Sequence, residues 1–376
     1  MRAQPGRHPR TRHQRHERAD RTRSCRQRPV PGGRHRGQRR RPDQAAGADL
    51  DAGERCQVKS KNTTGILFGA PDRGGAIHHE KYKQRGEHMP AAIFIGGDPI
   101  QYLVAPARYG ADELAVAGGI RGEAIEMVKC KTVDLEVPAH AEIIIEGEVL
   151  MDHTEPEGPF GEFTGYMAGG REGPVFRVNC ITHRKDPIVM GVISQFPPSE
   201  SSMIKRALLE AGLKKHLTED LNLPGIHDVH ALEAGGGTAT LWISMKKMYS
   251  GHVDQTAFGT MGHFGMSYFK WIVICDDDID INDPFMRDWV MAWRVRPDKD
   301  IKTIPDTASV ELDPSSFEPG LTQADIGGTK MVIDATKKWD YPAVSLPPLE
   351  QMREVADNWD DYGLPELDEL KLPREG

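Results

Sequence analysis

Two carboxylates lie five residues apart in a glycine-rich stretch near the middle of the chain. Glu157 and Glu162 belong to the run EGPFGEFTGY, residues 157–166. Because glycine and proline interrupt helices, this run predicts a bent loop. One carboxyl group in such a loop could act as a general acid while the other orients a neighbouring group. The two acids taken alone, however, favour a simpler alternative, which is an acidic hairpin-like loop in solvent.

Strand patterns on both sides of the loop predict that a sheet positions it. Residues 143–145 are three consecutive isoleucines, and apolar and polar residues alternate over 176–180. Both patterns are typical of β-strands. We therefore expect a sheet to hold this loop. Such a sheet could place one acid for proton transfer and the other to orient a partner, and the choice between this and an acidic loop in solvent stays open at this point.

The other clusters of reactive side chains are weaker signals. Asp276, Asp277 and Asp278 follow an apolar run and resemble an edge that holds Mg²⁺, but a strand-terminal turn or a helix cap explains them better. The chain has no GxxxxGKS/T, GxSxG or HExxH motif, which argues against a P-loop nucleoside triphosphatase, an α/β-hydrolase serine and a helical zinc site. Its five cysteines are scattered without a CxxC pair, which indicates free thiols in a reducing cytosol.

Residues 1–54 differ sharply in composition from the rest of the chain. They contain 15 arginines, no lysine and 6 acidic residues, so they carry +9 while the remainder carries −17 of the total of −8. They also contain no Ile, Phe, Trp or Tyr, so we expect them to be disordered. A basic tail, a transit peptide and an abnormal, out-of-frame start are the three interpretations, and the absence of lysine favours the last. The segment has no apolar core typical of a secretory signal.

Helical and strand patterns from residue 55 onward predict two further domains. Strands alternate with helices in the second of them, which favours an α/β domain. The predicted strands cover 64–69, 91–97, 134–150, 187–196, 229–234, 240–245 and 270–275. The predicted helices cover 76–85, the residues after Ser199, where Met203, Ala207, Leu208 and Ala211 form a stripe, and a segment between the strands 240–245 and 270–275. No apolar run is long enough to span a membrane.

A last helix is predicted near the C-terminus. Its apolar residues at 349, 352, 355, 356, 359 and 362 follow helical spacing. Such a stripe must pack against the body of the protein or against a neighbouring subunit.

Several motifs of this chain occur in one known family in the same order and at matching spacings. They are VKC at 128–130, VPA at 137–139, EGPFGEFTGY at 157–166, PVF at 174–176, ITHR at 181–184, CDDD at 275–278, and KM and DAT within 330–336. From about Arg55 to near its C-terminus, the chain resembles the UbiD family of prenylated-flavin-dependent decarboxylases. The resemblance implies reversible decarboxylation of an aromatic or α,β-unsaturated carboxylic acid on prenylated FMN. It also implies Mn²⁺ or Mg²⁺ at the cofactor phosphate, with K⁺ as a further ion.

The resemblance assigns roles to individual residues. Glu162 takes the position of the proton donor, and Glu157 that of the carboxylate paired with the family's arginine. Arg55 best fits that arginine, whose guanidinium can hold a substrate carboxylate with two hydrogen bonds. The implied flavin-binding residues are Arg55, Phe68, Gly69, Ala70, Arg73 and Gly74, and the implied metal ligands are Glu113 and Asp72.

The chain departs from the family pattern in three places. Leu50 stands where the family has a metal-ligating asparagine, and Asp72 stands where the family tends to have histidine. A carboxylate at position 72 still suits Mg²⁺ or Mn²⁺. The family's N-terminal domain is expected to be missing before Arg55. Two alternatives therefore stay open: a catalytically impaired, truncated subunit that only assembles with homologues, and a nucleic-acid binder acting through residues 1–41.

Our prediction is an α/β (α+β) cytoplasmic carboxy-lyase. Residues 1–54 form the disordered segment, 55–196 a split β-barrel that binds flavin, 197–340 an α/β domain, and 341–376 a C-terminal amphipathic helix and tail for oligomer contacts. The predicted partners are the small carboxylic acid substrate, a flavin prenyltransferase that supplies the cofactor, and further copies of the chain in a homodimer or larger oligomer. Neither a membrane span nor nucleic-acid binding is expected.

Overall fold

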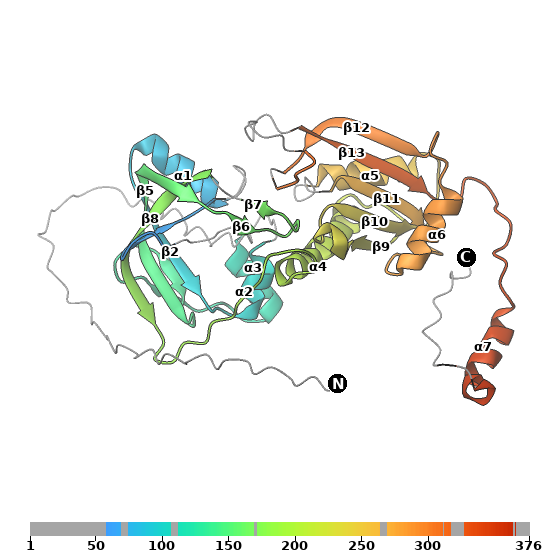
Figure 1. Cartoon of the computed structure of the whole chain (residues 1–376), viewed down its shortest axis with the longest axis horizontal. Helices are drawn as coiled ribbons and strands as arrows, with labels where there is room; N and C mark the ends of the chain where they lie inside the picture. Colours follow the sequence, from blue (N-terminus) through green and yellow to red (C-terminus); the bar gives the residue numbers. More distant parts are fainter. Residues whose placement is uncertain are drawn as a thin grey trace, which may run out of the picture. The chain divides into compact units, whose positions relative to one another are not determined.

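The structure, a computed structural model, describes residues 58–68, 74–106, 112–168, 171–263, 269–310, 312–316, 327–363 and 365. Within them the chain has a mixed α/β fold built on a four-stranded and a five-stranded sheet (Figure 1). The predictions for residues 1–54 and for Arg55, Gly69, Ala70, Asp72 and Arg73 lie outside the described residues. No helix in the described ranges is long and apolar enough to cross a membrane.

The four-stranded sheet is antiparallel and has the order β1-β8-β5-β2. Its strands are β1 (Thr63–Gly65), β2 (Met89–Ile95), β5 (Ile143–Glu157) and β8 (Arg171–His183). Met89, Val149 and Phe176 form its core with Ile66, and Tyr82 of α1 (Gly74–Arg85) packs against them. The strands predicted around this sheet are confirmed in outline, although β1 is shorter than the predicted 64–69. Closure of the sheet into a split barrel stays a prediction.

Glycines end the short helices near this sheet. α1 ends just before Gly86, whose φ is +68°, and α3 (Glu113–Arg121) ends at Gly122 with φ of +83°. Both glycines adopt the left-handed conformation that commonly terminates helices. Asp112 begins α3, because its side chain accepts a hydrogen bond from the backbone N–H of Ala115 at 3.0 Å. The sequence alone left the 113–126 region unassigned.

Two further short elements lie next to α3 in the chain. The helix α2 (Pro99–Val104) precedes it, and the strand β3 (Met127–Lys129), which follows it, pairs with β4 (Glu136–Pro138).

The five-stranded sheet has the order β12-β13-β11-β10-β9. Its inner strands β10 (Thr240–Met245), β11 (Trp271–Asp276) and β13 (Gly327–Ala335) are parallel. The edge strands β9 (Ile226–Ala231) and β12 (Ile301–Ala308) run antiparallel to their neighbours. The three strands predicted between 229 and 275 are confirmed, together with the helix predicted between the last two, α5 (His252–Gly262).

Helices cover both faces of this sheet. Leu241, Ile243 and Ile272 share one core cluster with residues of α4 (Glu200–Lys215) and α5. Trp242 and Val273, which are adjacent to them in sequence, share a second cluster with residues of α6 (Pro284–Arg294). Because successive side chains of a strand point to opposite faces, continuous apolar runs such as 271–275 are suited to a sheet buried on both sides.

The buried face of α4 differs from the predicted stripe. The helix begins after Ser199, as predicted, and the Ser199 N–H donates to Ser202 Oγ at 3.0 Å. Ala207 and Ala211 are exposed, however. The fully buried residues of the helix are Ser201, Ser202, Lys205 and Leu213. Polar residues therefore occupy much of the inward face, which a hydrophobic pattern could not reveal.

The strand predicted over residues 187–196 is wrong. The segment has no regular secondary structure, although the Ile188 N–H donates to Glu142 Oε2 at 3.1 Å. Its large apolar side chains are exposed, namely Ile188, Val189, Met190, Val192, Ile193 and Phe196. A short apolar run is ambiguous in sequence, because a strand also needs a neighbouring strand to pair with.

The predicted C-terminal helix is present as α7 (Leu349–Asp357), followed by a 3₁₀ turn at Trp359–Tyr362. None of the residues of α7 is buried. The proposed use of its apolar stripe in oligomer contacts stays a prediction, as do the domain boundaries at 54, 196 and 340.

Candidate active site

The structure buries the side chains of both candidate acids, at the end of β5 and in the turn that follows it. Glu157 is the last residue of that strand and lies opposite Arg171 of β8. A small hairpin of β6 (Phe160–Gly161) and β7 (Met167–Ala168) follows, so the predicted bend is confirmed. Glu157 is 0% exposed and Glu162 is 3% exposed. The simpler alternative, an acidic hairpin in solvent, is therefore wrong.

Glu157 is held between a lysine and a glycine. Lys59 Nζ lies 2.9 Å from Glu157 Oε2, and the same ammonium donates to the carbonyl oxygen of Pro156. A Cβ atom on Gly65 would lie 1.9 Å from Glu157 Oε2, so only glycine leaves room for the carboxylate there. Sequence reasoning missed Lys59, because its contact with Glu157 requires β1 to pair with β8 and β8 with β5.

Glu162 lies in a tight turn fixed by its backbone. Its N–H donates to the carbonyl oxygen of Tyr166 at 3.0 Å, and the Gly165 N–H donates to the Glu162 carbonyl at 2.9 Å. Gly165 has φ of +88°, a conformation that glycine adopts without strain. The Phe163 N–H donates to Glu162 Oε2 at 3.3 Å. This carboxyl group is therefore presented from a rigid turn.

Phe163, the residue after Glu162, packs against a cation and a glycine turn. The ammonium of Lys205, a buried residue of α4, lies 4.1 Å from the centroid of the Phe163 ring. A Cβ on Gly236 would lie 2.8 Å from the Phe163 carbonyl oxygen, and Gly236 also has φ of +64°. Gly235 ends a short 3₁₀ helix, and Gly236 and Gly237 form the turn after it. This turn fits closely against the acid-bearing loop.

The other implied site residues are only partly in the described ranges. Phe68 is half-buried, and its ring centroid lies 5.2 Å from that of His79 on α1. Gly74 is the first residue of α1, and Glu113 is the first residue of α3. No group of three or more His, Cys, Asp or Glu side chains in the described ranges could hold a metal ion. Metal ligation by Glu113 and Asp72 therefore stays a prediction.

A second group of acids lies where the parallel strands of the five-stranded sheet end. Arg294 Nη1 and Nη2 donate to the two carboxylate oxygens of Asp278, each at 2.7 Å, and Nη1 also reaches Asp276 Oδ2 at 3.0 Å. Lys337 Nζ lies 3.0 Å from Asp278 Oδ2. Burial by itself would raise the pKa of the Asp278 carboxyl, but hydrogen bonds from Arg294 and Lys337 outweigh it and hold this pKa below its usual range.

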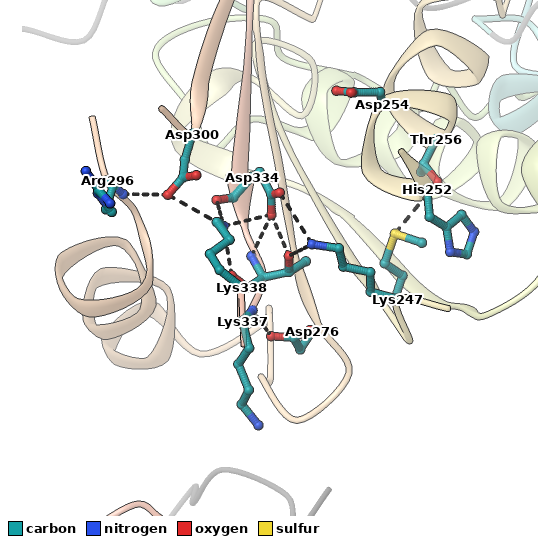
Figure 2. A network of polar contacts seen from close by, with 12 residues as sticks. Lys247, His252, Asp254, Thr256, Asp276, Arg296, Asp300, Asp334, Lys337 and Lys338 are labelled. Carbon is teal, nitrogen blue, oxygen red and sulfur yellow. Dashed lines mark hydrogen bonds and ion pairs between the residues drawn. The ribbon is translucent and has the colours of Figure 1, made fainter. Parts of the chain in front are cut away.

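Figure 2 shows that the neighbouring charges at this edge are paired in the same way. Lys338 lies between Asp334, at 3.0 Å, and Asp300, at 3.6 Å. Thr336 donates to Asp334 from its backbone N–H at 3.0 Å, and Lys337 donates to Asp276 from its backbone N–H at 2.7 Å. Asp277 and Asp278 form a turn after β11, as predicted, but cations from α6 and from the residues after β13 hold the acids there. This edge resembles a structural ion-pair network more than a metal site.

Comparison with known proteins identifies the family to which this chain belongs. The family model described as the 3-octaprenyl-4-hydroxybenzoate carboxy-lyase Rift-related domain matches residues 48–197, and the model of the C-terminal domain of the same enzyme matches residues 202–335. A solved structure of the UbiD-class enzyme HmfF from Pelotomaculum thermopropionicum in complex with FMN is 31% identical, with a TM-score of 0.69. The match covers 82% of this chain and 69% of HmfF. The chain belongs to the UbiD family.

Other proteins match over a similar share of this chain. The vanillic acid decarboxylase of Sedimentibacter hydroxybenzoicus in its closed form is 29% identical over 81% of this chain and 64% of its own, with a TM-score of 0.70. Uncharacterized proteins of Synechocystis and Archaeoglobus fulgidus are 32% and 33% identical, each over 83% of this chain. The matched region spans 62% and 65% of the length of these two curated relatives.

Proposed function

We propose that this UbiD-family chain is a carboxy-lyase that reversibly and non-oxidatively decarboxylates an aromatic or α,β-unsaturated carboxylic acid on prenylated FMN. The observation that carries the proposal is the pair of buried carboxylates, Glu157 and Glu162, on one bent loop at the end of β5. Solved relatives contain FMN or prenylated FMN, and others are decarboxylases of hydroxylated or methoxylated benzoic acids, which supports the same chemistry here.

In this proposal the two acids have separate roles. Glu157 orients Arg55, and the Arg55 guanidinium holds the substrate carboxylate with two parallel hydrogen bonds. When the bond between the substrate carbon and the carboxylate breaks, CO₂ leaves and the electron pair stays on the carbon. Glu162 then delivers a proton to that carbon and is reprotonated from solvent. The backbone hydrogen bonds that fix the Glu162 turn support this role, because a proton donor must be held in a narrow geometry.

Prenylated FMN, when bound, supplies the electron sink for the carbanion-like intermediate. Arg55, Phe68, Gly69, Ala70, Arg73 and Gly74 would hold the flavin, and Glu113 and Asp72 would ligate Mn²⁺ or Mg²⁺ at its phosphate, with K⁺ as a further ion. A flavin prenyltransferase would supply the cofactor. We further propose a cytoplasmic homo-oligomer in which α7 contributes to subunit contacts.

The proposed function is tested by producing the chain together with a flavin prenyltransferase. Bound prenylated flavin should be visible in the absorbance spectrum, metal analysis should find Mn²⁺ or Mg²⁺, and a panel of aromatic acids should include one that releases CO₂. A spectrum without flavin would contradict the proposal.

Replacement of Glu162 by Gln gives the largest effect that we expect. Glu162→Gln keeps the shape of the side chain but removes the proton donor, so both decarboxylation and solvent-deuterium exchange at the substrate carbon should fall by about 10²- to 10⁴-fold. Glu172→Gln is the matched control, because Glu172 is an exposed acid of β8. Retained turnover in Glu162→Gln would remove Glu162 from the proton-donor role.

A second candidate is a catalytically impaired subunit that assembles with intact homologues. Both candidates use α7, a helix with an apolar stripe and no buried residue, as a subunit contact. Purification with a co-produced homologue separates the two candidates, since the second predicts a mixed oligomer in which this chain binds no flavin.

A further inference from the structure

We propose that Lys59 is a positioning residue for the reaction, which holds the Glu157 carboxylate in the orientation that the substrate-binding arginine requires. This inference rests on the proposed function and adds a cation that neither the family motifs nor the sequence pattern assigned. Three features of the structure support it: the way in which Lys59 is anchored, its two contacts, and the space around Glu157.

Lys59 is anchored by a tight turn before β1. Its N–H donates to the Thr63 carbonyl oxygen at 3.0 Å, and the Ser60 N–H donates to the same oxygen at 3.2 Å. The turn continues into β1, whose residues Thr63 to Gly65 pair with β8, and β8 in turn pairs with β5. The Ile66 N–H donates to the Pro174 carbonyl at 3.0 Å and extends the same ladder. The backbone therefore fixes where the lysine side chain starts.

The ammonium contacts two successive residues at the end of β5. Nζ lies 2.9 Å from Glu157 Oε2 and donates to the Pro156 carbonyl oxygen. The Lys59 side chain is 14% exposed. A charge pair of this kind is screened far less by salt than a surface pair, and a buried carboxylate that loses its cation is strongly disfavoured. Lys59 therefore places a cation directly beside Glu157 Oε2 and limits where that oxygen can lie.

The space around Glu157 leaves the carboxylate little freedom. A Cβ on Gly65 would lie 1.9 Å from Oε2. A Cβ on Gly173 would lie 3.4 Å from the Glu157 Cβ and 3.1 Å from the Ile66 carbonyl oxygen. The two glycines belong to β1 and β8, which lie on the same side of β5, and Lys59 Nζ lies 2.9 Å from one of the Glu157 oxygens. The arrangement therefore limits the directions in which the Glu157 carboxylate can point.

The test uses the full chain loaded with prenylated flavin and compares Lys59→Met, Lys59→Arg and Lys61→Met. Lys59→Met keeps the apolar stem and removes the cation. Lys61 is exposed in the same turn, so Lys61→Met makes the same chemical change away from Glu157. We expect Lys59→Met to raise KM for the carboxylic acid by about tenfold or more and to lower kcat/KM by up to about a hundredfold, as misplacement of a binding group does. Flavin content per chain should stay within about twofold.

Rescue separates positioning from a merely structural role. Lys59→Arg keeps a cation that can reach both oxygens, so kcat/KM should return to within about threefold of the parent chain. Lys61→Met should match the parent. If Lys59→Met leaves KM and kcat unchanged for each flavin-loaded molecule and only lowers the amount of folded protein, the proposal is overturned.

A second measurement does not depend on the flavin or on turnover. Urea unfolding of the unloaded parent chain, Lys59→Met, Glu157→Gln and the double variant gives the coupling between the two side chains. We expect a coupling of about tenfold or more in the unfolding equilibrium constant. Additive effects would overturn the proposal even if the enzyme is active. If the parent chain is inactive but the unfolding data show strong coupling between Lys59 and Glu157, the proposed function is contradicted while the contact between the two side chains is supported.

Discussion

Two regions of this protein contain buried acids, and they differ in what surrounds the carboxylates. At the end of the five-stranded sheet, Asp276 and Asp278 share Arg294 and Lys337, and the nearby acids pair with Lys338. At the end of β5, Glu157 is held by one lysine against glycine, and Glu162 accepts a hydrogen bond from the backbone of Phe163. In the first region guanidinium and ammonium groups hold the carboxylates, whereas in the second close-lying glycines and a backbone N–H help to position them.

The difference indicates that burial of an acid does not by itself identify a catalytic site. In the aspartate cluster at the sheet edge, guanidinium and ammonium groups occupy the positions where a metal ion or a substrate would have to bind. In the acid loop, glycines bring backbone and carboxylates together. Two predictions separate stability from catalysis in these regions, and a third tests a buried histidine outside them. They follow from the largest expected effect to the smallest.

Removal of the Arg294 guanidinium should lower the stability of the protein without affecting the loop that contains Glu157 and Glu162. Arg294→Met leaves Asp278 and Asp276 buried without their guanidinium partner, so the free energy of unfolding should fall by about 3–5 kcal/mol. Arg296→Met is the matched control, because the Arg296 side chain is 51% exposed and its pair with Asp298 should contribute less than about 1 kcal/mol. Urea unfolding measures both. Equal losses in the two variants would contradict a special role for Arg294.

A methyl group at Gly65 should affect catalysis and stability together. Gly65→Ala forces the Glu157 carboxylate to move, which should cost about 1–3 kcal/mol of unfolding free energy and reduce kcat/KM of the flavin-loaded chain. Gly119→Ala provides the contrast, because a Cβ there meets nothing within 4 Å and alanine favours the helix by roughly 0.5–1 kcal/mol. Gly119→Ala should therefore stabilise the protein and leave kcat/KM unchanged. An active, stable Gly65→Ala would show that Glu157 has room to adapt.

The smallest expected effect is a pH dependence from His252, away from both acid clusters. This residue is fully buried at the start of α5, its Nδ1 accepts from the Met248 N–H at 3.2 Å, and its ring stacks on Tyr249. Burial lowers the pKa of His252, and a hydrogen bond to the Pro224 backbone only partly opposes this. Since the folded-state pKa lies below the unfolded value of about 6.5, this stabilisation is complete above pH ~6.5 and is lost as pH falls through the folded-state pKa.

The measurement is urea unfolding at pH 7.5 and pH 5.5. In the parent chain the free energy of unfolding should fall between these values, and His252→Gln should reduce that fall. His140→Gln, which changes a largely exposed histidine, should retain it. A parent chain and a His252→Gln variant with the same pH dependence would exclude His252 as its source.

Several local features could be predicted from the sequence because their causes are local. α1 ends at Gly86 and β2 ends before Gly96, and both glycines adopt positive φ. The alternation of apolar residues located β8, and the order of strands and helices after Ser199 predicted an α/β arrangement. Each of these depends on the conformational preferences of neighbouring residues.

Features that depend on distant partners could not be predicted. Residues 187–196 have the composition of a strand but lack a strand to pair with. The buried face of α4 contains Ser202 and Lys205 rather than the alanines of the apolar pattern. Arg294 lies in the last turn of α6, 16 residues after Asp278. The spacing of the two residues does not indicate that this turn lies next to the end of β11.

The sequence by itself determined the family, through the motifs around Glu157 and Glu162, and the approximate succession of strands and helices. Only the tertiary structure decided that both glutamates are buried and that Asp276 and Asp278 are bound by Arg294. It also decided that Lys59, which belongs to none of the recognised motifs, lies against Glu157. The physical reason is that burial and ion pairing depend on which strands lie side by side. The pairing of β1 with β8, and of β8 with β5, joins residues almost a hundred positions apart.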